Sequence, residues 1–271
     1  MSFQPAIPIG GYTGWRFLQR TMAGQKAAFL ADPTIKRDVD YFRENIGKVR
    51  TAQDLTSDRR MLNVALSAFG LERDLDSRYF VERVLAEGTT DRAALANKLA
   101  DKRYAAFSKA FGFDSALGPR TQFSVLAEEI TERFRAKEFE SAVGAQNNDL
   151  RLAMNVSGEL NDMFKKGGTD RSHWFTMMGT PPLREVFETA FGFPSGFGSL
   201  DIDQQLDQFR KRSEAVLGSD TFADLKDPAL QEKLIQTFLI RREADQFSAR
   251  SSSGQVALAL LSSMGNPWKT G

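Results

Sequence analysis

The sequence contains no cysteine and a single histidine, His173, among its 271 residues. Without thiols the chain can form no disulfide, no zinc–thiolate site and no cysteine nucleophile. His173 stands beside Ser172 and near Asp170, but neighbouring residues on a helix point in different directions, so the cluster does not predict a catalytic triad. We therefore expect no catalytic residue, no metal and no cofactor, and we expect that the protein is not an enzyme.

Net charge is almost absent as well, since 36 basic and 35 acidic residues leave +1 at pH 7. This balance predicts no electrostatic surface for nucleic acid. No apolar run approaches the roughly 20 residues of a membrane-spanning helix, so we expect no membrane insertion. The first residues lack the basic start and apolar core of a cleaved secretory signal. We expect a cytoplasmic protein, while export by a route that cleaves no signal stays open.

What the sequence does have is one short pattern, used repeatedly. The stretches 58–71 (DRRMLNVALSAFGL), 101–113 (DKRYAAFSKAFGF) and 181–193 (PPLREVFETAFGF) share it, and 228–240 (PALQEKLIQTFLI) is a looser copy without the glycine. Apolar residues stand four positions before the aligned phenylalanine and, in three copies, eight positions before it. This spacing keeps them on one helical face. The aligned phenylalanines are Phe69, Phe111, Phe191 and Phe238.

Each copy also carries signals for where a helix begins or ends. Possible N-cap residues precede three of the copies, namely Asp58, Thr180 and Asp227. Glycines that follow the phenylalanine are expected in the left-handed conformation that ends a helix, and these are Gly70, Gly112 and Gly192. An Ala-Phe-Gly ending offers no group that titrates or coordinates, so the pattern predicts a structural framework rather than a catalytic signature.

Because no segment alternates with period two, we predict an all-α fold without a sheet, a compact array of helices built from divergent repeats. Residues 1–13, with two prolines and adjacent glycines, are predicted to be extended. Residues 14–242 are predicted to form one helical domain, with possible sub-repeats 14–118 and 119–242. Residues 243–271 read as a polar, serine-rich linker followed by a short apolar segment.

Some apolar residues lie outside the repeated pattern, in the loop after its third copy and in the C-terminal tail. One interpretation is that they dock on the body of the protein. The other is that a loop or a short helix places its apolar side in a groove of another protein. The candidate partner-binding residues are Phe197, Leu258, Leu261 and Trp268.

Seven stretches spread over nearly the whole chain form a longer composite pattern. They are YTGWRFLQRT (12–21), YFRENIGKV (41–49), DLTSDRRMLNVALSAFGL (54–71), LANKLADKRYAAFSKAFGF (95–113), WFTMMGTPPLREVFETAFGFP (174–194), LDIDQQL (200–206) and FLIRR (238–242). In these stretches the chain resembles an uncharacterised, all-helical family of alphaproteobacteria that is found beside flagellar basal-body genes. The resemblance implies a flagellum-related protein without assigned chemistry, and it brings no catalytic residues.

Three hypotheses follow for the function. The leading one is a non-enzymatic protein that binds other proteins in flagellar assembly or regulation. The second is a structural or exported component of the flagellum. The third, an enzyme or a small-molecule-binding protein, requires a deep pocket lined by convergent polar groups, and the sequence shows no such set. No pattern predicts the oligomeric state or the identity of the partner.

Overall fold

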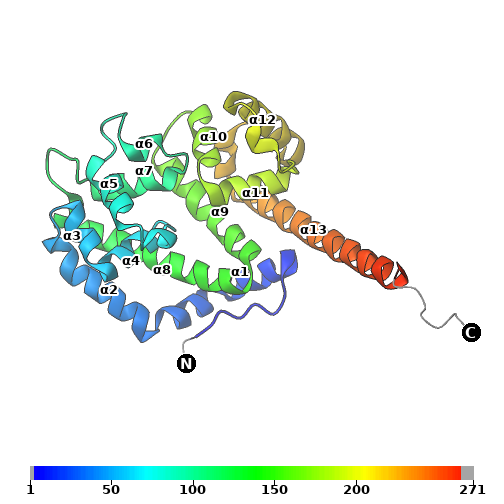
Figure 1. The fold of residues 1–271 in the computed structure, drawn as a ribbon, viewed down its shortest axis with the longest axis horizontal. Helices are drawn as coiled ribbons and strands as arrows, with labels where there is room; N and C mark the ends of the chain where they lie inside the picture. The colour runs from blue at the N-terminus through cyan, green and yellow to red at the C-terminus, as the bar shows by residue number, and fades with distance from the viewer. Residues whose placement is uncertain (1–2, 264–271) are drawn as a thin grey trace, which may run out of the picture.

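A computed structural model describes residues 3–263 of the chain, and residues 249–263 by their backbone alone (Figure 1). Over this range the chain forms thirteen α-helices and short 3-10 helices, with no strand, which confirms the predicted all-α fold. The first eight helices are α1 (Gly11–Leu30), α2 (Pro33–Asn45), α3 (Ala52–Ser57), α4 (Arg59–Ser67), α5 (Arg78–Glu87), α6 (Leu95–Lys98), α7 (Lys102–Phe111) and α8 (Ser124–Gln146). The other five are α9 (Asn148–Lys165), α10 (Asp170–Met178), α11 (Pro181–Phe191), α12 (Ile202–Leu217) and α13 (Pro228–Ser263). The 3-10 helices are η1 (Ile46–Lys48), η2 (Glu72–Asp74), η3 (Arg120–Gln122), η4 (Phe197–Ser199) and η5 (Phe222–Lys226).

Two hydrophobic clusters divide the helices into two lobes. The N-lobe is built from α2 to α7 and the first half of α8, and the C-lobe from α1, the second half of α8 and α9 to α13. Helix α8 belongs to both, because Ile130 and Phe134 lie in the first cluster whereas Phe139 and Val143 lie in the second. The lobes therefore do not follow the suggested sub-repeats 14–118 and 119–242, since α1 packs against α9 and α13 of the C-lobe.

The four phenylalanines of the repeated pattern are all buried, Phe69 and Phe111 in the N-lobe and Phe191 and Phe238 in the C-lobe. Helices α7 and α11 end at glycines in the left-handed conformation, Gly112 and Gly192, with φ of 61° and 69°. Gly70 also has positive φ, but α4 ends three residues earlier, at Ser67. The fourth copy has no glycine, and α13 continues through it.

An arginine from a later part of the chain meets each of the three glycine ends. The Arg103 guanidinium donates to the carbonyl of Gly70, and Arg120 donates to the carbonyl of Ala110 at 3.1 Å. The Arg241 guanidinium lies against Gly192. A cation at the C-terminus of a helix satisfies free carbonyls and opposes the negative end of the helix dipole. The glycine ends therefore serve as contact points between helices as well as stop signals.

The predicted N-caps differ in outcome. Asp58 accepts hydrogen bonds from the backbone N–H groups of Arg60 and Met61, and Asp227 accepts one from that of Ala229. Thr180 stands at the N-cap position of α11 as predicted, but it makes no capping hydrogen bond, because its hydroxyl donates to the carbonyl of Thr176 in the preceding helix, at 2.8 Å. The short connection between α10 and α11 lets the end of one helix take the hydroxyl before the start of the next can use it.

The N-terminal segment differs from the prediction in length. Helix α1 begins at Gly11 rather than after residue 13. The segment before it is held against the body, because the Gln25 side chain bonds both backbone groups of Ala6 and Gln146 donates to the carbonyl of Pro5 at 2.6 Å.

The C-terminal segment differs in kind. The structure places residues 243–263 in α13 rather than in a polar linker. The reason is that no proline interrupts α13, and serines or the isolated Gly254 lower helix propensity by only about 0.5–1 kcal/mol each, which does not end a helix.

Replacing Gly192 with alanine tests the glycine end of α11. We expect Gly192→Ala to lower the free energy of unfolding by about 1–2 kcal/mol, because the left-handed conformation strains any residue with a Cβ. The new Cβ would also lie 2.2 Å from Nη1 of Arg241, so that side chain must move. Urea unfolding measures the effect. Gly196→Ala is the control, since Gly196 has φ of −80° and open space around it; an equal loss in both variants would contradict the interpretation.

Candidate functional site

Of the four candidate partner-binding residues, Phe197 is part of the core. Only 4% of Phe197 is exposed, its ring stacks on Phe193 with centroids 3.9 Å apart, and its edge meets Phe209. The prediction that Phe197 offers a docking surface therefore needs correction: η4 turns the loop back onto α12. Leu258 and Leu261 lie in α13 among the residues described by backbone alone, and Trp268 lies outside the described residues.

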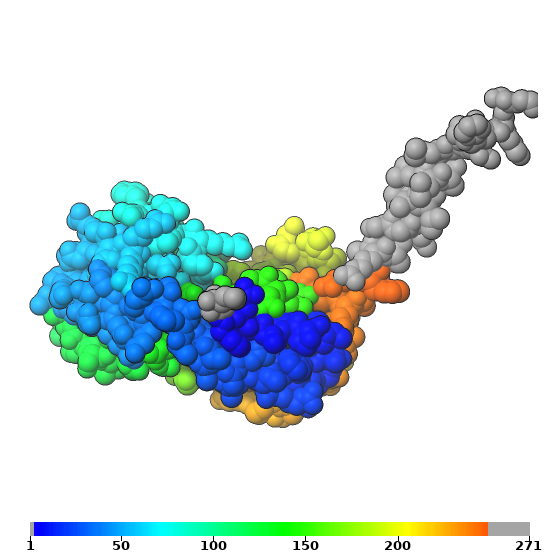
Figure 2. Space-filling model, turned by 90° about the horizontal axis from the view of Figure 1, so that it is seen from below, coloured from blue at the N-terminus to red at the C-terminus, as the bar shows by residue number. Residues whose placement is uncertain are grey.

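Beyond its first three turns, α13 leaves the body. Leu234, Ile235, Phe238 and Leu239 are buried in the C-lobe, but from Ile240 to residue 248 every residue except Arg242 is exposed. Figure 1 shows α13 running outward past the other helices of the C-lobe, and Figure 2 shows its last described side chains, in orange, at the edge of the body. We call residues 240–248 the exposed arm, since they are the part of the departing helix whose side chains are described.

Polar contacts hold the base of the exposed arm. Arg242 forms ion pairs with Asp149 at the start of α9 and with Glu185 of α11. The Glu243 carboxylate lies at the N-terminus of α1, where a Cβ built on Gly11 would be 1.7 Å from its Oε1 atom. Three helices of the C-lobe therefore contact the base of the arm.

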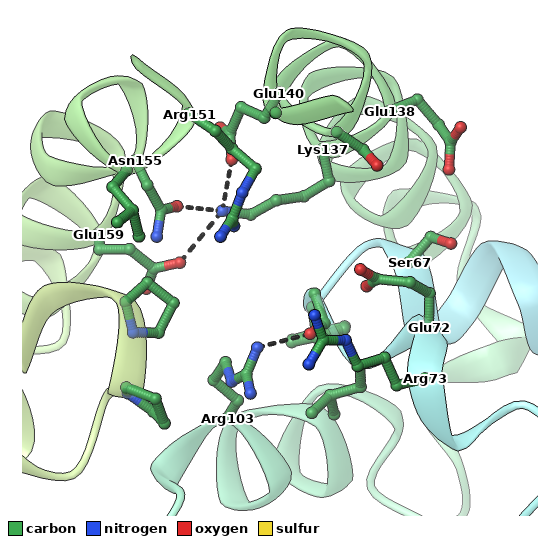
Figure 3. A pocket seen from close by; sticks show the side chains of 18 of the residues that line it. Ser67, Glu72, Arg73, Arg103, Lys137, Glu138, Glu140, Arg151, Asn155 and Glu159 are labelled. Carbon is green, nitrogen blue, oxygen red and sulfur yellow. Dashed lines mark hydrogen bonds and ion pairs between the residues drawn. The ribbon is translucent and has the colours of Figure 1, made fainter. Parts of the chain in front are cut away.

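A cavity of about 710 Å³ lies between the two lobes (Figure 3). The N-lobe wall comes from the end of α4, η2 and α7, and the C-lobe wall from α9 and α11, while α8 crosses between them. The spacing of apolar residues along α8 explains the hollow. Phe139 follows Phe134 by five residues instead of four, which moves the apolar stripe about 140° around the helix. The face of α8 that carries Ile130 and Phe134 continues with Lys137, Ser141 and Gly144, and these three residues line the cavity.

Lys137 is the most connected charge in the cavity. Its ammonium group donates to Glu140 at 2.9 Å, to Glu159 at 3.3 Å and to the side-chain oxygen of Asn155 (Figure 3). Burial pulls the pKa of Lys137 down, but the two carboxylates outweigh burial, so its pKa lies above its ordinary value. Lys137 is therefore held in its protonated form.

The N-lobe wall also has its charges engaged. Arg103 binds both carboxylate oxygens of Asp101 and the carbonyl of Gly70. The Tyr104 hydroxyl donates to Asp74 at 2.6 Å, and burial together with that carboxylate raises the pKa of Tyr104. These groups fix the end of α4 against α7.

Glu138 is the exception, because no cation lies within ion-pair distance of it among the residues whose side chains are described. Burial raises the pKa of Glu138, and the negative charges of Glu72 and Asp38 raise it further, while a hydrogen bond with Ser67 acts in the opposite direction. The pKa of Glu140 is also raised by burial, although Lys137 offsets part of that effect. The cavity thus holds a carboxylate whose negative charge is not neutralised.

The residues around the single histidine do not form a triad. Asp170 accepts from the backbone N–H of Phe222, and the Ser172 hydroxyl donates to the carbonyl of Thr169. His173 itself is buried against Phe164 and Phe222, and neither ring nitrogen has a hydrogen-bond partner in the described structure. Within that same part of the chain no group of three or more His, Cys, Asp or Glu residues could hold a metal ion.

The structure brings together a convergent polar set that sequence reasoning missed. Its members come from five separate parts of the chain, so no local motif contains them. One local signal existed: Lys137, Glu138 and Glu140 surround a buried phenylalanine in the middle of α8, where the apolar stripe changes face. An enzyme or a small-molecule-binding protein needs a pocket lined by convergent polar groups, and this cavity is such a pocket.

Comparison with known proteins places the chain in a family. Residues 68–230 match the family described as protein of unknown function (DUF1217). The chain belongs to this family. Every residue that lines the cavity except Ser67 lies within the matched region, whereas the exposed arm lies beyond it.

A solved structure is similar over most of the chain. It is the X-ray structure of a protein from the alphaproteobacterium Agrobacterium tumefaciens, determined in a structural genomics programme. The TM-score is 0.70 with 27% sequence identity, over 89% of this chain and 98% of the other. No protein with a curated description matches the chain. These findings confirm the resemblance to an uncharacterised family with an alphaproteobacterial relative.

Replacing Glu138 with glutamine tests the electrostatics of the cavity. We expect Glu138→Gln to raise the melting temperature at pH 7 by roughly 2 °C, because the folded state no longer has to hold a buried charge. A carboxylate with a raised pKa contributes stability below its ordinary pKa of 4.5 and loses it as pH rises through the folded value. The advantage of the variant should therefore disappear as pH falls below 4.5.

The matched control is Glu132→Gln on the exposed side of the same helix, where the side chain is 58% exposed. Its melting temperature should stay at that of the unmodified protein at both pH values. A lower melting temperature for Glu138→Gln at pH 7 would contradict the electrostatic interpretation.

Proposed function

We propose that this protein is a non-enzymatic binding protein for other proteins, acting in flagellar assembly or regulation, and that the exposed arm of α13 is the element that docks. The proposal puts it in the cytoplasm, with protein partners rather than nucleic acid. In the described residues no helix combines the length and apolar character needed to cross a membrane.

The observation that carries the proposal is the exposure of the arm. Ile240 is 50% exposed and Phe247 is 75% exposed. Because the two residues stand seven positions apart, they lie on one side of the helix. A helix in water gains most of its stability from packing an apolar face. The contacts of residues 240–248 with the body that the structure shows are polar, and the apolar side chains Ile240 and Phe247 stay exposed. An apolar stripe on such a helix has the form that enters a groove on another protein.

The flagellar part of the proposal rests on a different support. The repeated stretches resemble a family of alphaproteobacteria that is found beside flagellar basal-body genes, and genes that stand together often serve the same assembly. The matched family is described as one of unknown function, so the flagellar part is tested by the identity of the recovered partner.

The side chains of the cavity favour binding over catalysis. A serine nucleophile is usually activated by a histidine or by a neutral lysine. The described lining of the cavity has no histidine, and Lys137 is held protonated by Glu140 and Glu159. This supports a non-enzymatic function.

Replacing Phe247 with serine tests the docking role of the arm. Each variant would be expressed as a tagged protein in a motile alphaproteobacterial host that carries its gene, and bound proteins would be recovered after crosslinking. We expect Phe247→Ser to reduce recovery of the partner by roughly 10-fold or more, the effect of losing a central apolar anchor. Its melting temperature should not change, because the ring is exposed.

Tyr79→Ser is the matched control, since Tyr79 is an 80% exposed aromatic residue on α5 of the N-lobe. It should recover the partner as the unmodified protein does. Equal recovery with Phe247→Ser and Tyr79→Ser would exclude the arm as the docking element, and a partner unrelated to the flagellum would remove the flagellar part of the proposal.

Removing residues 245–271 is the complementary test. We expect partner recovery to be lost while circular dichroism still shows a folded helical body with an unchanged melting temperature. Among the described residues that the truncation removes, Gln246 donates a solvent-exposed hydrogen bond to Asp149 of the body at 3.0 Å, and its loss should change stability little. If the protein is instead an exported component of the flagellum, it will be secreted in a manner that depends on the flagellar export apparatus.

A further inference from the structure

The charges that line the interlobe cavity are unequal in number. Four cationic side chains face it, and they are Arg73, Arg103, Lys137 and Arg151. Six carboxylates face it, and they are Glu72, Asp74, Glu138, Glu140, Glu159 and Glu185. A cleft lined by an excess of one sign concentrates ligands of the opposite sign.

Most of these cations are already engaged by the protein. Lys137 is held by Glu140, Glu159 and Asn155, and Arg103 by Asp101. Arg151 donates from two nitrogens to the side-chain oxygen of Asn148, at 3.0 and 2.7 Å. An incoming anion would have to displace these partners. The fourth cation, Arg73, has no ion-pair partner among the described side chains, but it directly follows Glu72 in η2, whose carboxylate would repel an anion there. An anionic ligand is therefore a poor match.

The carboxylates of Glu72 and Glu138 are in the opposite situation. Glu72 is exposed at the N-lobe wall, and each of the two residues adds negative potential at the other. Figure 3 shows them with Ser67 on the side of the cavity opposite Asn155 and Glu159. The excess negative charge is therefore concentrated at the junction of η2 and α8.

We infer that the interlobe cavity binds an organic cation, whose ammonium or guanidinium group lies between Glu72 and Glu138. The volume of about 710 Å³ falls in the range of small-molecule sites, roughly 300–1,000 Å³. Hydrogen-bond acceptors rather than a metal-ligand set surround the position, which fits an N–H donor. This site is separate from the exposed arm and does not depend on the proposed function.

Two sources could supply such a group, a free polyamine or guanidino compound and a basic side chain of a polypeptide. Isothermal titration calorimetry at physiological salt would use agmatine and spermidine as one arm and capped lysine and arginine tripeptides as the other. We expect binding in at least one arm and a higher melting temperature with the ligand present. Tighter binding of the free amines assigns a small metabolite, and tighter binding of the peptides assigns a protein side chain.

The Glu138→Gln variant locates the site. It keeps the size of the side chain and removes the charge, so the affinity for the cation should fall by roughly 10-fold or more, the loss expected for a charged hydrogen bond. Glu132→Gln on the same helix should bind as the unmodified protein does. Circular dichroism and thermal melting confirm that both variants are folded. The inference is overturned if no cation binds, if Glu138→Gln binds as tightly as Glu132→Gln, or if phosphate or citrate binds in place of the cations.

Discussion

Helix α8 is the constraint on which the rest of the structure depends, because one continuous helix supplies core residues to both lobes. Leu126 and Phe134 are buried in the N-lobe, and Phe139 and Val143 in the C-lobe. A helix is rigid over this length, so the change of apolar face after Phe134 sets how the two cores lie relative to each other. The same change leaves a polar face without a packing partner, and the cavity lies there. The lobe arrangement and the cavity thus have one physical cause.

The glycine ends of the repeated helices work in a similar way on a smaller scale. A left-handed glycine lets backbone N–H groups after the helix bond some of its last carbonyls, and an arginine from another helix or loop can bind one that remains. Arg103 joins the end of α4 to α7, and Arg120 joins the end of α7 to the segment before α8. The repeated pattern therefore organises the fold in two ways: its apolar face packs in the cores, and its glycine ends bind arginines from other parts of the chain.

These features mark the limit of what the sequence could predict. Periodicity, caps and glycines are local signals, and they gave the all-α fold, the cap at Asp58 and the left-handed Gly112 and Gly192. The capping bond of Thr180 and the docking role of Phe197 failed because each side chain has two possible partners. The end of the preceding helix takes the Thr180 hydroxyl, and the tertiary structure packs Phe197 against Phe193 and Phe209. The cavity could not be read from the chain, since its charges come from separate elements. The spacing of five residues between Phe134 and Phe139 in α8 is visible in the sequence. It indicates a cavity only when the positions of both lobes around α8 are known.

The cavity and the exposed arm meet at one side chain, Glu185, which lines the cavity and also pairs with Arg242 at the base of the arm. This contact could in principle couple the two sites. An ion pair whose carboxylate is 44% exposed contributes only about 0–1 kcal/mol, however. Burial of side chains such as Phe238 and Leu239 contributes about 1.5–3 kcal/mol each, so apolar packing, not the ion pair, holds α13 in the C-lobe. A cation that drew Glu185 away from Arg242 would therefore leave α13 in place, and the two sites can be studied independently.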